Sequence, residues 1–163
     1  MSETPLPLGS LRFPENLHLA KLVRKAHGLG IRFAPSNVHE LWFYQPADRT
    51  IYVWEPDLAN EPLPYLVVIL AHELGHVIDF SRHPSHLEMT RHLHWSQVPA
   101  EIEFSAFITG YCLLQELEIP LSVEDYTFFI DPQMAGQVRA ALTAREACRQ
   151  IAAYQEVDES RPV

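Results

Sequence analysis

Cysteine, long apolar runs and positive charge are all scarce in this chain. Its 163 residues include only two cysteines, Cys112 and Cys148, too few for the disulfide framework of a small secreted domain. No uninterrupted apolar run approaches the roughly 18 residues of a membrane span, and the first residues lack the charged-then-apolar pattern of a signal peptide. These absences predict a cytoplasmic protein without a membrane span.

Acidic residues outnumber basic ones by 21 to 12, so the formal net charge is −9. Proteins that grip DNA or RNA do so largely through Lys and Arg contacts to phosphates, so we expect no direct binding to nucleic acid. The negative charge is compatible with a basic partner, although acidic surfaces commonly serve only solubility. The length fits a single domain, and the sequence leaves the oligomeric state open.

The most informative motif is His72-Glu73-Leu74-Gly75-His76, which follows an aliphatic run. Two histidines four positions apart share one face of a helix, so both imidazoles can reach one Zn²⁺ at about 2.0–2.1 Å. Glu73 lies beside them and would act as general base for the attacking water. The motif therefore predicts the HExxH site of a zinc hydrolase, with other divalent ions such as Mn²⁺ as possible substitutes.

A catalytic zinc ion needs a third protein ligand. The extended metzincin pattern would supply a Gly and then a His after the motif, but Asp79 and Arg82 stand at those positions. The other source of a ligand is a carboxylate on a second helix, which the sequence predicts over residues 99–118. Two glutamates, Glu101 and Glu103, lie in the first turn of that helix, where its dipole favours negative charge.

Helical geometry separates the two glutamates. Glu103 falls on one stripe with Phe107, Gly110 and Leu114, which is the face expected to pack inward, whereas Glu101 points about 160° away. Gly110 would let another helix come close. We therefore predict Glu103 as the third zinc ligand and Glu101 as a solvated charge.

The remaining pattern predicts an α+β domain, a small antiparallel sheet of about three strands packed on a helical core that carries the HExxH helix and the glutamate helix. The expected elements are a helix over 15–27, strands over 31–33, 38–44 and 50–54, the zinc helix over 62–82, a polar loop over 84–97, and helices over 99–118 and 133–155. The expected boundaries are a loose N-terminal arm over 1–14, a single zinc metallopeptidase domain over 15–155, and a frayed tail over 156–163.

The motif, followed by Glu103 in a Glu-x-x-Ala-Phe-x-x-x-x-x-Leu-Leu context, resembles the ImmA/IrrE family of small gluzincin-type metallopeptidases. The β-like segment 49–54 ahead of the zinc helix is similar too, and the resemblance covers about 15–120. Two features depart from the family pattern. The glutamate helix has an extra turn before Pro120, and the segment between the ligand helices is rich in histidine.

Several further side chains have open roles. Asp79 shares the stripe of His72 and His76 and would either orient a ligand imidazole or serve as a capping or surface charge near the helix end. His83 lies about 16 Å along the axis from His72, too far to join the same metal. His86, His92 and His94 invite a second metal site, but their spacing matches no known ligand pattern, which favours a solvated loop.

The oxyanion of the reaction could be stabilised by one of those loop histidines, by Tyr111 or by Tyr126. For the substrate, we expect an extended peptide to pair with residues 49–54 as an edge strand. The family resemblance implies a regulatory substrate, typically a helix-turn-helix repressor of transcription that is cleaved during stress.

Three functions are therefore weighed. The first is a zinc endopeptidase of narrow specificity. The second is a zinc-dependent interaction protein that holds a repressor or a toxin–antitoxin partner without cutting it, although binding alone would not need Glu73. The third is a purely structural zinc site, which usually includes Cys ligands, and neither cysteine lies near the motif.

Overall fold

The computed structural model describes residues 11–93 and 97–159, with side chains described as far as residue 145. The chain divides into two compact units, Met1–Pro120 and Leu121–Val163, which are described separately here. All the predicted metal ligands lie in the first unit. The prediction of one domain over 15–155 remains a prediction.

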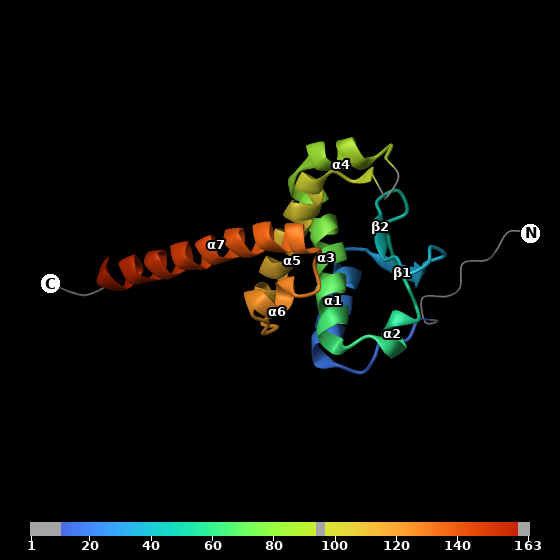
Figure 1. Cartoon of the computed structure of the whole chain (residues 1–163), viewed down its shortest axis with the longest axis horizontal. Coiled ribbons are helices and arrows are strands. Elements are labelled where there is room, and N and C mark those ends of the chain that lie inside the picture. Colours follow the sequence, from blue (N-terminus) through green and yellow to red (C-terminus); the bar gives the residue numbers. More distant parts are fainter. Residues whose placement is uncertain (1–10, 94–96, 160–163) are drawn as a thin grey trace, which may run out of the picture. The chain divides into compact units, whose positions relative to one another are not determined.

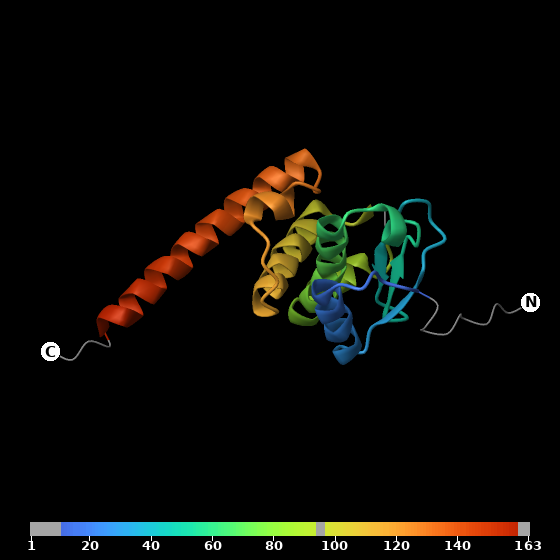
Figure 2. The ribbon, with the colours of Figure 1, turned by 90° about the horizontal axis from the view of Figure 1, so that it is seen from below.

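The first unit combines helices with a small sheet, and it confirms the predicted α+β class. Its elements in order are α1 (Leu17–Gly28), β1 (Arg32–Pro35), β2 (Phe43–Gln45), β3 (Thr50–Val53), α2 (Asp57–Asn60), α3 (Leu63–Arg82), α4 (Pro84–Thr90) and α5 (Ala100–Glu116). Helix α3 lies between the sheet and α5 (Figures 1 and 2). The site is therefore carried by the central element of this unit.

Helix α3 is the predicted zinc helix, and its observed bounds match the prediction closely. It begins without a polar cap but with proline in its first turn, where the missing N–H is no loss. It ends at Arg82 because Pro84 disfavours helical backbone in the preceding residue. By length and apolar composition α3 could cross a membrane, but 72% of its most apolar stretch is buried inside the protein, as in a core helix.

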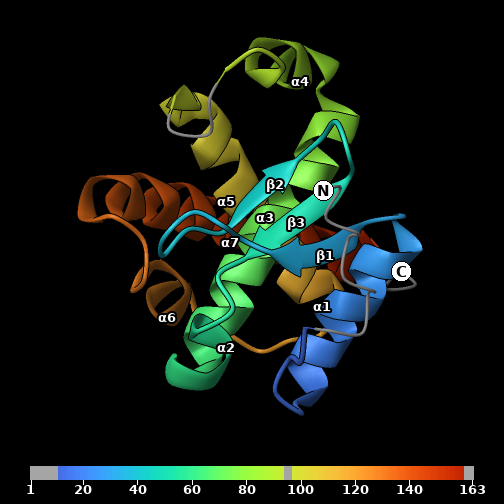
Figure 3. The same ribbon diagram turned by 90° about the vertical axis from the view of Figure 1, so that its right-hand side faces the viewer.

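The sheet has three strands in the order β1–β3–β2, so β3 is central. Strand β2 pairs antiparallel with β3, from Phe43 opposite Tyr52 to Gln45 opposite Thr50. Strand β1 pairs parallel with β3, from Arg32 opposite Thr50 onward. The sheet is therefore mixed, which corrects the antiparallel prediction, and Figure 3 shows it lying in front of α3.

The predicted strand over 38–44 is shorter than expected. The amide of Val38 donates to Ser36 Oγ at 3.1 Å, and the amide of Leu41 donates to the Val38 carbonyl at 3.1 Å. Glu40 has a φ of 58°, in the left-handed region that a strand excludes. These turns hold the chain until Phe43, where β2 begins.

Helix α5 is the predicted glutamate helix and packs closely against α3 at Gly75. A Cβ atom built on Gly75 would lie 2.1 Å from the carbonyl oxygen of Ala106 and 3.1 Å from the amide nitrogen of Gly110. No side chain fits in that space, so glycine is required for this approach of the two backbones. The backbone of Gly110 lies at this contact, and its predicted role in letting the helices come close stays a prediction.

Helix α1 supports the other end of α5. Asn16 caps α1, because its side chain accepts hydrogen bonds from the amides of His18 and Leu19 at 2.9 and 3.2 Å. Lys21 of α1 then donates from Nζ to the carbonyl of Leu117 at 3.0 Å, at the end of α5 where a positive charge is favourable. The hydrogen bond fixes α1 to α5.

Helix α4 replaces part of the polar loop predicted over 84–97. Pro84 occupies the first turn of α4, and Thr90 closes its end by donating from Oγ1 to the carbonyls of His86 and Leu87, each at 3.0 Å. The prediction was wrong for 84–90, because helix-initiating proline outweighs the polar composition. His94 and Trp95 lie outside the described residues.

The second unit contains α6 (Val123–Thr127) and α7 (Pro132–Glu159). Arg139 of α7 donates to Thr127 Oγ1 at 3.0 Å, which ties the two helices together. Helix α7 covers the helix predicted over 133–155 and continues into the predicted tail, as far as Glu159. Residues 160–163, like 1–10 of the predicted arm, lie outside the described residues.

Candidate metal centre

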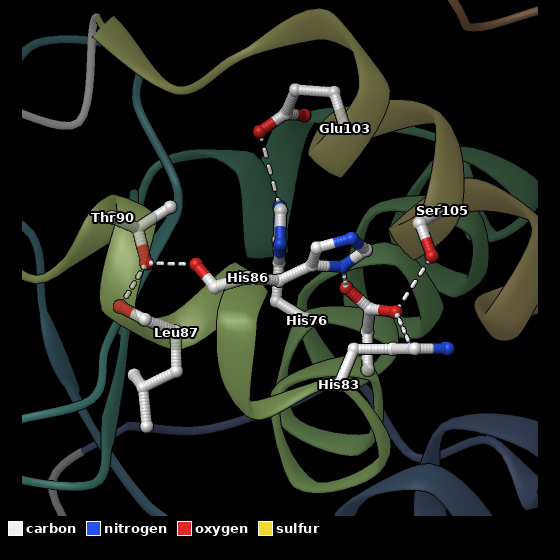
Figure 4. Close-up of polar contacts among 8 residues, drawn as sticks. His76, His83, His86, Leu87, Thr90, Glu103 and Ser105 are labelled. Carbon is white, nitrogen blue, oxygen red and sulfur yellow. Dashed lines mark hydrogen bonds and ion pairs between the residues drawn. The ribbon is translucent and has the colours of Figure 1, made fainter.

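Three predicted ligands meet between α3 and α5. His72 Nε2 lies 2.9 Å from Glu103 Oε2, and His76 Nε2 lies 3.1 Å from Glu103 Oε1. The glutamate carboxylate thus faces both imidazoles, as Figure 4 shows for His76. Their donor atoms are close enough together to hold one metal ion. Glu101, by contrast, is exposed, as predicted.

The two imidazoles are held by burial and by aromatic rings. The side chains of His72 and His76 are only 10% and 8% exposed. The His72 ring stacks on Phe107 of α5 with centroids 3.8 Å apart, and the His76 ring lies 5.6 Å from Phe80. Phe107 was predicted to face inward but not to contact a ligand. Its place one helical turn after Glu103 is the signal that could have revealed this contact.

The charge of Glu103 is stabilised by these neighbours. Burial alone would raise the pKa of this carboxyl, but hydrogen bonds and attraction from His72 and His76 outweigh burial and hold the pKa well below its usual range. Burial likewise disfavours a charged His76, yet the Glu103 carboxylate raises the pKa of His76 overall. The carboxylate is therefore ionised, which is the form that binds a metal.

Glu73 lies inside the same site but outside the donor set. It is buried, and burial raises the pKa of its carboxyl above the ordinary value. The positive charges of His72 and His76 lower that pKa in part, as does a backbone hydrogen bond from Tyr44 of β2. A raised pKa is the direction that suits a carboxyl to general-base work. The contribution of Tyr44 was not predicted from the sequence.

The donor set is compatible with a zinc ion. Two imidazole nitrogens and one carboxylate are a known ligand combination for such ions, which keep a further position open. Donors bonded to zinc at about 2.0–2.1 Å in a tetrahedron lie about 3.3 Å apart, close to the two distances observed here. Nε2 is the ring atom of each histidine that faces Glu103 and is placed to share an ion with it. The Nδ1 atoms of His72 and His76 have no hydrogen-bond partner within the described part of the chain.

Asp79 takes neither of the two roles considered for it from the sequence. Its carboxylate contacts His83 Nδ1 at 2.9 Å and His86 Nδ1 at 2.8 Å, and accepts a hydrogen bond from Ser105 Oγ at 2.6 Å. None of these partners is His72 or His76, so the prediction that Asp79 orients one of those two imidazoles is corrected. It is not a surface charge either, because it is fully buried.

The residues considered as stabilisers of the oxyanion differ in their surroundings. His86 is engaged with Asp79, His92 is exposed, and Tyr111 is buried on α5. Tyr126 belongs to the second unit, and His94 lies outside the described residues.

Comparison with protein-family models, with curated proteins and with solved structures found no match for this chain.

Proposed function

We propose that this protein is a zinc-dependent endopeptidase of narrow specificity, with the zinc ion held by His72, His76 and Glu103. The observation that carries the proposal is the position of Glu73. A buried carboxylate is costly unless opposite charge and hydrogen bonds compensate it, and this one lies beside both histidines without belonging to the donor set. A site that only binds zinc has no need of it.

The chemistry follows from the groups present. A zinc ion bound here would polarise the scissile carbonyl and favour ionisation of water. Glu73 would accept the proton of the attacking water and return it to the leaving amine. The raised pKa of Glu73 suits both steps, because the carboxyl can hold the proton between them.

The substrate surface must be revised from the sequence prediction. Residues 49–54 contain the central strand β3, which has neighbours on both sides and offers no edge to a peptide. Strand β2 is an edge strand, and its Tyr44 backbone contacts Glu73. We therefore propose that an extended segment of the substrate pairs with β2, where its scissile bond would come close to the general base.

The substrate class is proposed from the resemblance to ImmA/IrrE metallopeptidases. The resemblance implies that the substrate is a DNA-binding repressor. Because this chain is acidic, we propose that it contacts the repressor protein itself and not the DNA. The burial of α3 inside the protein is compatible with the proposed cytoplasmic location.

The proposal is tested by Glu73→Gln, which removes the base and leaves every proposed ligand in place. Helix-turn-helix proteins encoded by neighbouring genes are incubated with the zinc-loaded chain, and cleavage is followed by intact mass spectrometry. We expect cleavage by the wild type and a loss of about 10²–10⁴-fold in the variant, with zinc content unchanged. Zinc-dependent binding of a repressor without cleavage by the wild type would instead identify an interaction protein.

The role of β2 is tested by hydrogen–deuterium exchange on the inactive Glu73→Gln protein. Addition of the intact repressor that the wild type cleaves should slow amide exchange in residues 42–46. Strand β1, the other edge of the same sheet, is the internal control and should not change. Protection confined to β1 would show that the substrate binds at the opposite edge.

A further inference from the structure

A second cluster of potential metal ligands lies at the C-terminal end of α3. Asp79, His83 and His86 bring one carboxylate and two imidazoles together, with donor atoms close enough to share an ion. Each Nδ1 atom lies within 2.9 Å of its own carboxylate oxygen of Asp79. In Figure 4, the side chains of His83, His86 and Ser105, the three that contact Asp79, converge on one point.

The sequence around Pro84 explains how these three residues meet. His83 follows Asp79 by one helical turn, so both lie on the same face. In a continuous helix His86 would lie a further turn away, about 10 Å along the axis from Asp79. Pro84 ends α3, and the chain turns at His83, whose backbone amide donates to the Asp79 carbonyl at 2.7 Å. This turn brings His86 back to Asp79.

The electrostatics of Asp79 favour a bound cation. The carboxylate is 0% exposed, and its ion-pair partners in the described part of the chain are the two histidines alone. Burying a carboxylate is costly unless opposite charge compensates it. Neutral imidazoles supply hydrogen bonds but no charge, whereas a divalent cation would supply both bonds and charge.

The geometry and donor types are those of a transition-metal site. The nitrogen–oxygen distances of 2.8 and 2.9 Å match the 2.9 and 3.1 Å of the first cluster. Imidazole nitrogen with carboxylate oxygen suits zinc and its neighbours in the periodic table. Ser105 of α5 donates to the carboxylate, as outer partners of metal ligands do. The His83 side chain is 56% exposed, which leaves a solvent side for water ligands.

We propose that Asp79, His83 and His86 bind a second divalent transition-metal ion, with Zn²⁺ as the ion best suited to these donors. This ion would fasten α4 to the end of α3, since His86 belongs to α4 and Asp79 to α3. The site contains no glutamate placed like Glu73, so its role is to hold structure and not to hydrolyse. The proposal is independent of the peptidase function.

The test is zinc titration of the full metal-stripped chain, with bound zinc measured after dialysis. The wild type should bind two equivalents, and His86→Ala and His83→Ala should each bind one. The matched control is His92→Ala, a nearby exposed histidine outside the cluster, which should keep two. Saturation of the wild type at one equivalent, or two equivalents in His86→Ala, would overturn the proposal.

A single and a double variant distinguish zinc binding at the two sites. Glu103→Ala, which lacks a ligand of the first cluster, should still bind one equivalent, and Glu103→Ala/His86→Ala should bind none. Circular dichroism before titration shows whether each variant is folded. Zinc added to Glu103→Ala should also slow amide exchange in residues 84–90, and unchanged exchange there would contradict binding at α4.

Discussion

The two His–carboxylate clusters on α3 are built with opposite patterns of burial. In the first cluster the histidines are buried and the carboxylate of Glu103, delivered by α5, is 31% exposed. In the second, the carboxylate of Asp79 is fully buried and the histidines face outward, His86 being 22% exposed. Buried imidazoles with a partly exposed carboxylate would suit the proposed reaction beside Glu73, whereas a buried carboxylate would suit the proposed anchoring of α4.

The two clusters also differ in what brings their ligands together, which is helix packing in the first and a local turn in the second. The first cluster depends on two helices meeting at Gly75, so its ligands come from distant parts of the sequence. The second depends on a local turn at His83 and Pro84, with only Ser105 contributed by α5. Changes in helix packing should therefore disturb the first cluster more than the second.

The largest loss of hydrolysis and of bound zinc is expected from Glu103→Ala. It removes the only proposed first-cluster ligand that α5 provides, so peptide hydrolysis should be abolished and the zinc of that cluster largely lost, as measured by metal analysis. Glu101→Ala, on the exposed side of the same helix turn, should keep both. Zinc loss in Glu101→Ala with retention in Glu103→Ala would assign the ligand role to the other glutamate.

A large loss of folding stability is expected from Gly75→Ala. Its added Cβ would overlap the Ala106 carbonyl oxygen, and the free energy of unfolding should fall by about 1–3 kcal/mol or more in urea denaturation. The control is Gly136→Ala in α7, where nothing lies within 4 Å of the new atom. There the change should stabilise the helix by about 0.5–1 kcal/mol. Equal stability of Gly75→Ala and wild type would contradict the close helix contact.

Ser105→Ala should act on the second cluster alone. The change leaves the buried Asp79 carboxylate without one donor, which costs about 1.5–3 kcal/mol for a hydrogen bond to a charged group. Urea denaturation measures the loss, and Ser81→Ala, at an exposed position of α3, is the neutral control. Loss of hydrolysis in Ser105→Ala would show that the two clusters are coupled.

The smallest effect is expected from Phe107→Ala. Stacked aromatic pairs contribute about 0.5–1.5 kcal/mol, so the zinc affinity of the first cluster should fall roughly two- to tenfold. Competition with a chromophoric chelator measures that affinity. Phe104→Ala, another half-buried phenylalanine of α5, should leave it unchanged. A similar loss in both variants would point to general loosening of α5.

Much of the first cluster was predictable because its geometry is periodic. His72, Glu73 and His76 follow from one helix turn, and the convergence of Glu103 on both histidines follows from the inward stripe of α5 with Gly110. The sequence could not specify Tyr44 as a partner of Glu73, because that contact depends on where a strand packs against a helix.

The rest of the fold shows the same limit. Strand pairing is non-local, so a pattern that identifies three strands does not say that β1 lies parallel to β3 or that β3 is central. The second cluster was missed for a related reason. His83 and His86 were judged by their spacing along the chain, whereas the proline turn decides where they lie in space.

The glycine contact between α3 and α5 also has a consequence for the order of events in time. His72 and His76 belong to α3 alone, so they are available as soon as that helix forms, but Glu103 reaches them only after α5 has docked against Gly75. A metal ion bound at this cluster would therefore be captured late in assembly, and its binding free energy would contribute directly to holding the two helices together.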